Sequence, residues 1–109
     1  MSYIVVDVEA DGPIPHKYSM VCFGAVIVEA SLSKTFYGQV RPIAKDWIPE
    51  ALAVSGFSRQ DHENFDDPKV VMEQFNAWLR QHSVGSPIFI SDNLAFDWQC
   101  DLLPNAVAS

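Results

Sequence analysis

Two acidic residues, Asp7 and Glu9, stand two positions apart near the start of the chain, in the stretch IVVDVEADG. The apolar run Tyr3–Val6 before them is β-branched and aromatic, and it predicts a strand that is buried on both faces. Residues two apart in a strand point to the same side, so the two carboxylates share one surface. Neighbouring carboxylates repel each other unless a proton or a cation lies between them. A hard divalent ion such as Mg²⁺ or Mn²⁺ prefers such oxygen ligands, so the pair predicts a metal site.

A third acid, Asp97, follows a second apolar run near the end of the sequence. Pro87–Ile90 predicts a short buried strand, and residues 91–93 are N-cap types for a helix that runs through Leu103. On that helix Asn93 and Asp97 lie on the same face. Acids on a helix face, like an Asp-x-Glu pair at a strand end, are often only solvated. The string NLAFD directly after a strand is more specific than either feature alone.

These two stretches resemble the first and second motifs of the DnaQ-like (DEDD) 3′–5′ exonucleases, with Asp7-Val8-Glu9 as the first and NLAFD as the second. Their order, their spacing and their strand and strand-to-helix contexts all agree with that family. The resemblance implies an RNase H-like fold and a two-metal hydrolysis of phosphodiester bonds at the 3′ end of single-stranded RNA or DNA. It also implies two Mg²⁺ or Mn²⁺ ions, with Asp7, Glu9 and Asp97 as the catalytic metal ligands.

Two interpretations stay open for the turn that follows the first motif. The resemblance implies that Ala10, Asp11 and Gly12 offer groups to the terminal nucleotide, with Asn93 as a further substrate contact. Alternatively, Gly12 and the proline after it are present only to form the turn.

The third motif of the family carries a fourth acid and a general base, His or Tyr, and no such motif follows Asp97. Without it one metal is held by too few ligands and the proton of the attacking water has no acceptor. The general base is therefore unknown, and we expect one metal ion or none and weak or absent activity in this chain. His62, with Asp67 five positions later, lies between the first two motifs. A short acidic loop leading into a helix, with Asp67 as N-cap, is the better interpretation, so His62 is not assigned as the base.

The sequence between the motifs predicts the same architecture. Ser19–Val28 and Thr35–Val40 are apolar runs joined by a hairpin-like connection, and with the first strand they predict an antiparallel three-strand meander. A short helix over Glu50–Val54 and an amphipathic helix over Pro68–His82 follow. Ile88–Ile90 is then a fourth strand, parallel to the first. The predicted fold class is α/β, an RNase H-like mixed sheet with flanking helices, C-terminally truncated relative to the family. Two aromatic residues of the long helix are assigned to the core: Phe75 and Trp78.

Composition limits what else the chain can be. With 109 residues, 49% of them hydrophobic, residues 1–109 form a single exonuclease-like domain, which the resemblance makes incomplete at its C-terminus. The net charge of −7 and the absence of Lys or Arg after Arg80 argue against a long basic groove. We therefore expect a single-stranded 3′ end as substrate, gripped through metal and stacking contacts. No signal peptide or membrane-spanning run is found, so we expect a cytoplasmic protein with no membrane partner.

The end of the sequence leaves two origins open, a truncated or frame-altered gene product and a naturally short family member. Losing C-terminal helices would leave an apolar sheet face uncovered, and such faces favour association, so we expect a homodimer.

The motifs leave two functions open. The first is the metal-dependent 3′–5′ exonuclease. The alternative is a non-catalytic RNase H-like module for nucleic-acid binding or assembly.

Overall fold

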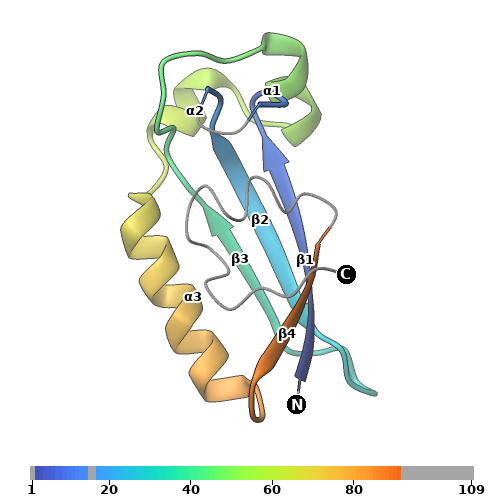
Figure 1. Cartoon of the computed structure of the whole chain (residues 1–109). Helices are drawn as coiled ribbons and strands as arrows, with labels where there is room; N and C mark the ends of the chain where they lie inside the picture. Colours follow the sequence, from blue (N-terminus) through green and yellow to red (C-terminus); the bar gives the residue numbers. More distant parts are fainter. Residues whose placement is uncertain (1, 15–16, 92–109) are drawn as a thin grey trace.

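The computed structural model describes residues 2–14 and 17–91, which form a four-stranded mixed sheet with helices beside it (Figure 1). The strand order is β3-β2-β1-β4, with β1 antiparallel to β2, β2 antiparallel to β3, and β1 parallel to β4. This arrangement confirms the predicted meander with one added parallel strand. In chain order the elements are β1 (Ser2–Ala10), β2 (Met20–Ile27), β3 (Thr35–Gln39), α1 (Pro49–Ser55), α2 (Arg59–Glu63), α3 (Pro68–His82) and β4 (Pro87–Ser91).

Strand β1 is buried on one face only. Ile4 and Val6 are 0% and 2% exposed, whereas Tyr3 and Val5 between them are 47% and 38% exposed. The prediction of a strand buried on both faces is therefore wrong. Every second residue of the apolar run packs into the core, and the residues between them form an apolar outer face that is exposed to solvent. We call this outer side the open face of the sheet.

Helix α3 covers the opposite face, and its bounds agree with the prediction to the residue. The Asp67 side chain accepts a hydrogen bond from the Lys69 N–H at 2.9 Å, which caps the helix as expected. Gly38 of β3 leaves room for the helix, because a Cβ atom there would lie 2.7 Å from Val71. The core between helix and sheet includes Ile4, Val6, Phe23, Val71, Phe75, Leu79 and Phe89, with Trp78 packed against it. The assignment of Phe75 and Trp78 to the core is confirmed.

Helices α1 and α2 lie at the end of the sheet where β1 finishes (Figure 1). Helix α1 extends one residue beyond the predicted Glu50–Val54 at each end, and it is capped by Gly56, whose φ of 84° is in the left-handed region. Helix α2 covers residues 59–63, so the acidic loop predicted from His62 onward is wrong at His62 and Glu63, while residues 64–67 lie outside the helices. The Ser58 hydroxyl accepts from the Asp61 N–H at 3.1 Å, and the Asp61 carboxylate accepts from the Ser58 N–H at 3.3 Å. This reciprocal capping box starts the helix.

Helix α1 and the residues that flank α2 pack on β2 through a second, smaller apolar cluster. It is made of Val21, Cys22 and Leu52, with Phe57 and Phe65 packed against it. No helix within residues 2–14 and 17–91 is long and apolar enough to cross a membrane.

Candidate active site

The structure places Asp7 and Glu9 on the open face of the sheet, near the end of β1. In the register with β2, Asp7 lies opposite Gly24 and Glu9 lies opposite Cys22. Two residues apart on one strand, the carboxylates project from the same side, Asp7 exposed and Glu9 half-buried. The register then shifts between Glu9 and Ala10, so the strand is irregular directly after the second acid.

The donor set of this pair suits a hard cation. Within the described residues no lysine, arginine or histidine forms an ion pair with Asp7 or Glu9. Two uncompensated carboxylates on one surface repel each other and gain from a divalent ion between them. In the same part of the chain no three His, Cys, Asp or Glu residues gather into a possible metal site. Asp97 and Asn93 lie outside the described residues, so their places in the site stay predictions.

Neutral groups surround the two carboxylates on the neighbouring strands. Burial raises the pKa of the Cys22 thiol, and the charges of Glu9 and Asp7 raise it further, against a lowering hydrogen bond from Tyr37. Burial likewise raises the pKa of the Tyr37 hydroxyl, with Cys22 as a further cause. Both groups are thus protonated at neutral pH and bring no positive charge to the site.

A hollow of about 300 Å³ adjoins Asp7 on the open face. Gly24 lies between Asp7 on β1 and Tyr37 on β3 in the strand register. Among the described residues, a Cβ atom at Gly24 would meet only the Phe36 carbonyl oxygen, at 4.0 Å, so this glycine leaves space above the sheet between Asp7 and Tyr37. The hollow is lined by residues that include Val5, Asp7, Gly24, Val26 and Thr35.

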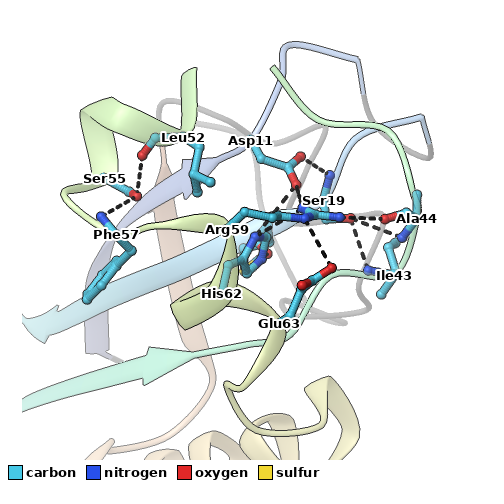
Figure 2. A network of polar contacts seen from close by, with 11 residues as sticks. Asp11, Ser19, Ile43, Ala44, Leu52, Ser55, Phe57, Arg59, His62 and Glu63 are labelled. Carbon is cyan, nitrogen blue, oxygen red and sulfur yellow. Dashed lines mark hydrogen bonds and ion pairs between the residues drawn. The ribbon is translucent and has the colours of Figure 1, made fainter. Parts of the chain in front are cut away.

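Asp11, only two residues beyond Glu9, has a different environment (Figure 2). It is 0% exposed, and its carboxylate accepts from the Ser19 N–H at 2.6 Å and from the Arg59 guanidinium at 2.9 Å. Its backbone N–H donates to Ser19, and its carbonyl accepts from Ile48, each at 2.8 Å. The Asp11 carboxylate therefore holds the turn and is not available to a substrate. Gly12 is buried too, with the Tyr18 ring directly against it, so half-buried Ala10 is the turn residue left for the predicted contact.

Arg59 and Ser19 extend this network to three segments of the chain. Arg59 lies at the start of α2 and also donates to the Ala44 carbonyl at 3.3 Å. The Ser19 hydroxyl accepts from the N–H groups of Ile43 and Ala44 at 3.0 and 3.1 Å. The turn after the first motif, the β3–α1 connection and α2 are thus fixed to one another, as Figure 2 shows.

His62 completes the network from inside the protein. It is 0% exposed, and its Nε2 lies 3.0 Å from the Met20 carbonyl oxygen. Because a carbonyl can only accept, Nε2 carries the hydrogen. Burial lowers the pKa of His62, and the Met20 carbonyl and the Asp11 charge offset part of that effect. A neutral, enclosed imidazole is not placed to take a proton from water, which agrees with leaving His62 unassigned as the base.

A known protein is similar in sequence to most of this chain. Over 99 residues the chain is 38% identical to the 3′–5′ DNA exonuclease Cap18 of Escherichia coli, a match that covers 88% of this chain and 52% of that protein. The chain therefore spans about half the length of this curated relative. No profile of a known protein family matches the chain.

Two solved structures have a similar fold. Cell-death related nuclease 4 (CRN-4) superposes with a TM-score of 0.65 at 19% identity, over 84% of this chain and 34% of that one. The zinc-bound complex of E. coli exonuclease I with single-stranded DNA gives 0.68 at 14% identity, over 91% and 22%. The chain has the RNase H-like fold of the DnaQ-like 3′–5′ exonucleases.

Within this exonuclease fold, sequence reasoning found the open pair of acids and missed the network beside it. Arg59 and Ser19 were not singled out, because neither stands in a motif of its own. The string Ser58-Arg59-Gln60-Asp61 does match a capping box, and that signal could have placed Arg59 in the first turn of a helix. Nothing local could have paired Arg59 with Asp11, which lies 48 positions earlier.

Proposed function

We propose that the chain carries the first and second motifs of a metal-dependent 3′–5′ exonuclease that acts on single-stranded nucleic acid. One observation carries this proposal: Asp7 and Glu9 share the open face of β1, with no cationic partner among the described residues. The similarity to a protein named as a 3′–5′ DNA exonuclease supports the direction of attack and favours DNA over RNA.

Asp7, Glu9 and Asp97 would hold one Mg²⁺ or Mn²⁺ ion at this surface, where the complete family site holds two. When bound, such ions supply an activated water and stabilise the leaving oxygen of the phosphodiester. The carboxylates of this chain would hold the metal on the sheet, and its Asp11 network fixes the turn that would meet the terminal nucleotide. The general base is not assigned to any residue of the chain.

A single-stranded substrate agrees with the charge of the protein. With a net charge of −7 the chain lacks the excess of Lys and Arg that binds the backbone of a long duplex. The exonuclease I structure with single-stranded DNA has the same fold as this chain. The 3′ end would reach the carboxylates past Ala10, and Asn93 would contribute a further contact.

A non-catalytic module for nucleic-acid binding or assembly is the second candidate. It stays open because no residue of the chain is assigned as the general base. Such a module would keep the fold and the turn network and bind at most one metal ion.

A homodimer is also part of the proposal, through the apolar end of the open face at Tyr3 and Val28 and not over Asp7 and Glu9. Four apolar or aromatic side chains beside or on this face are 38% to 57% exposed: Tyr3, Val5, Val28 and Tyr37. Light scattering coupled to size exclusion tests it, because Val5→Glu would shift a dimer toward monomer and leave a monomer unchanged. The cytoplasmic location expected from the sequence is likewise proposed, and cell fractionation tests it.

The decisive experiment is hydrolysis of 5′-labelled single-stranded DNA and RNA by the purified chain in Mg²⁺ and in Mn²⁺. Asp7→Asn removes one proposed ligand, and Glu73→Gln removes an equal charge from the exposed side of α3 as a matched control. Stepwise shortening from the 3′ end that persists in the control and disappears in Asp7→Asn supports the exonuclease. Folded protein that cleaves no more than Asp7→Asn contradicts it and favours the non-catalytic module.

A further inference from the structure

The β3–α1 connection presents an exposed indole beside the turn that follows the first motif. Trp47 is 38% exposed, although large aromatic rings are usually well buried. The guanidinium carbon of Arg59 lies 5.3 Å from the centre of a Trp47 ring. The indole thus rests on a cation on one side while more than a third of its surface meets solvent.

The support beneath Trp47 is rigid. The Arg59 side chain is only 14% exposed and is held by Asp11 at 2.9 Å and by the Ala44 carbonyl at 3.3 Å. The backbone on either side of Trp47 is fixed as well, because Ala44 donates to Ser19 and Ile48 donates to Asp11. An aromatic ring that is already ordered loses little conformational entropy when a ligand stacks on it.

Trp47 also lies beside the segment that leaves the first motif. Its neighbour Ile48 is hydrogen-bonded to Asp11, which follows Glu9 by two residues. The connection that carries Trp47 passes across the end of the sheet where β1 finishes (Figure 1). A strand of nucleic acid with its 3′ end at the two carboxylates would have bases within reach of this end of the molecule.

We propose that Trp47, backed by Arg59, is a stacking platform for a base of single-stranded nucleic acid whose 3′ end lies at Asp7 and Glu9. The inference rests on the proposed function and adds a residue that grips the substrate. Stacking on an aromatic ring is tolerant of sequence, and it suits a protein whose acidic surface offers little attraction to phosphates. The simpler explanation is that Trp47 only shields Arg59 from water.

Binding of a labelled oligonucleotide separates these explanations. The parent is the Asp7→Asn protein, which lets binding be measured without cleavage, and the probes are 5′-fluorescein dT12 and rU12 followed by anisotropy. Trp47→Leu removes the π-face but keeps apolar bulk, and Trp47→Phe keeps a ring. We expect Trp47→Leu to weaken binding roughly 5- to 100-fold and Trp47→Phe to restore most of it. The control is Leu32→Ala, an exposed apolar residue of the β2–β3 connection.

A second measurement needs no substitution at Trp47. A series of oligonucleotides, each with one abasic site, locates the position at which a missing base weakens binding to the parent protein. We expect one such position a few nucleotides from the 3′ end, and we expect the profile to become flat in Trp47→Leu. A flat profile in the parent overturns the inference even if Trp47→Leu does not fold. Equal affinity of parent and folded Trp47→Leu also overturns it.

The outcomes separate this inference from the proposed function. Cleavage that depends on Asp7, together with binding that is indifferent to Trp47, leaves the exonuclease and removes the platform. Binding that depends on Trp47 in a protein that never cleaves leaves the platform and favours the non-catalytic module. A parent protein that binds neither polymer contradicts both.

Discussion

Three acids fall within five residues, yet the fold gives them opposite environments. Asp7 and Glu9 lie on the open face of the sheet, without a cationic partner among the described residues. Asp11 is 0% exposed and is bonded to Arg59 and to the Ser19 backbone. The carboxylates of Asp7 and Glu9 are therefore available to an external cation, whereas the charge of Asp11 is balanced by Arg59.

This difference shows how a candidate metal ligand can be told from a structural acid. Residue type and spacing are the same, because Asp7, Glu9 and Asp11 alternate along one segment. What differs is the hydrogen-bond donors nearby, since among these three acids Arg59 and the Ser19 N–H are recorded as partners of Asp11 alone. Acids left without internal donors are the ones that an external cation can stabilise.

The largest effect should come from removing the buried acid. Asp11→Ala leaves the Arg59 guanidinium, 14% exposed, without its main partner. Breaking a buried ion pair from one side costs about 3–5 kcal/mol, and the remaining contact of Arg59 with Glu63 places this case near 3 kcal/mol. Urea unfolding measures the loss. Asp7→Ala, by contrast, should leave the free energy of unfolding nearly unchanged.

The control for this prediction replaces both members of the pair. Asp11→Leu with Arg59→Met should recover part of the loss, because no unpaired charge then remains buried. Similar losses for Asp11→Ala and Asp7→Ala would show that the contrast between the two environments is wrong.

A smaller effect should follow from adding metal. A ligand that binds only the folded state at about 100 times its dissociation constant raises the free energy of unfolding by about 2.7 kcal/mol. We expect Mn²⁺ or Mg²⁺ to raise the unfolding temperature of the unmodified chain and of Ser19→Ala, which keeps both open acids. Asp7→Asn and Glu9→Gln should lose most of that shift. A shift of the same size in all four proteins would place the metal somewhere else.

The sequence predicted those parts of the fold that local signals determine. Helix α3 begins after its Asp67 cap and ends at His82 as expected, and Gly56 closes α1. Strand β1 was placed correctly, but its exposure was not. An apolar run says that a strand is possible, and only the packing of α3 on one side decides which face is covered.

The candidate site also has a part that local sequence signals predict and a part that only the folded structure shows. Asp7 and Glu9 could be paired from sequence because period-two geometry is local to one strand. The partnership of Asp11 with Arg59 spans 48 positions and arises only when α2 folds back on the turn. Asp97 and Asn93 were predicted from their motif, and they lie outside the described residues.

The smallest effect should come from the acid–base state of the buried network. The pKa of His62 is lowered in the folded protein, chiefly by burial, so the unfolded chain takes up a proton at a higher pH than the native one. The contribution of His62 to stability is therefore fully present above its ordinary value of about 6.5 and declines as the pH falls below it. The decline is at most about 1.4 kcal/mol per pH unit. Chemical unfolding at intervals between pH 7.5 and 5.5 measures this slope.

Two variants show whether the slope belongs to His62. His62→Gln removes the titrating ring but keeps a donor for the Met20 carbonyl, so it should flatten the dependence over this interval. Ser19→Ala weakens the same network without changing a titratable group, so it should lower stability equally at each pH and keep the slope. If His62→Gln kept the slope, the proton would be taken up elsewhere. The buried network would then be insensitive to pH in this range, and its contrast with the open carboxylates would rest on ion pairing alone.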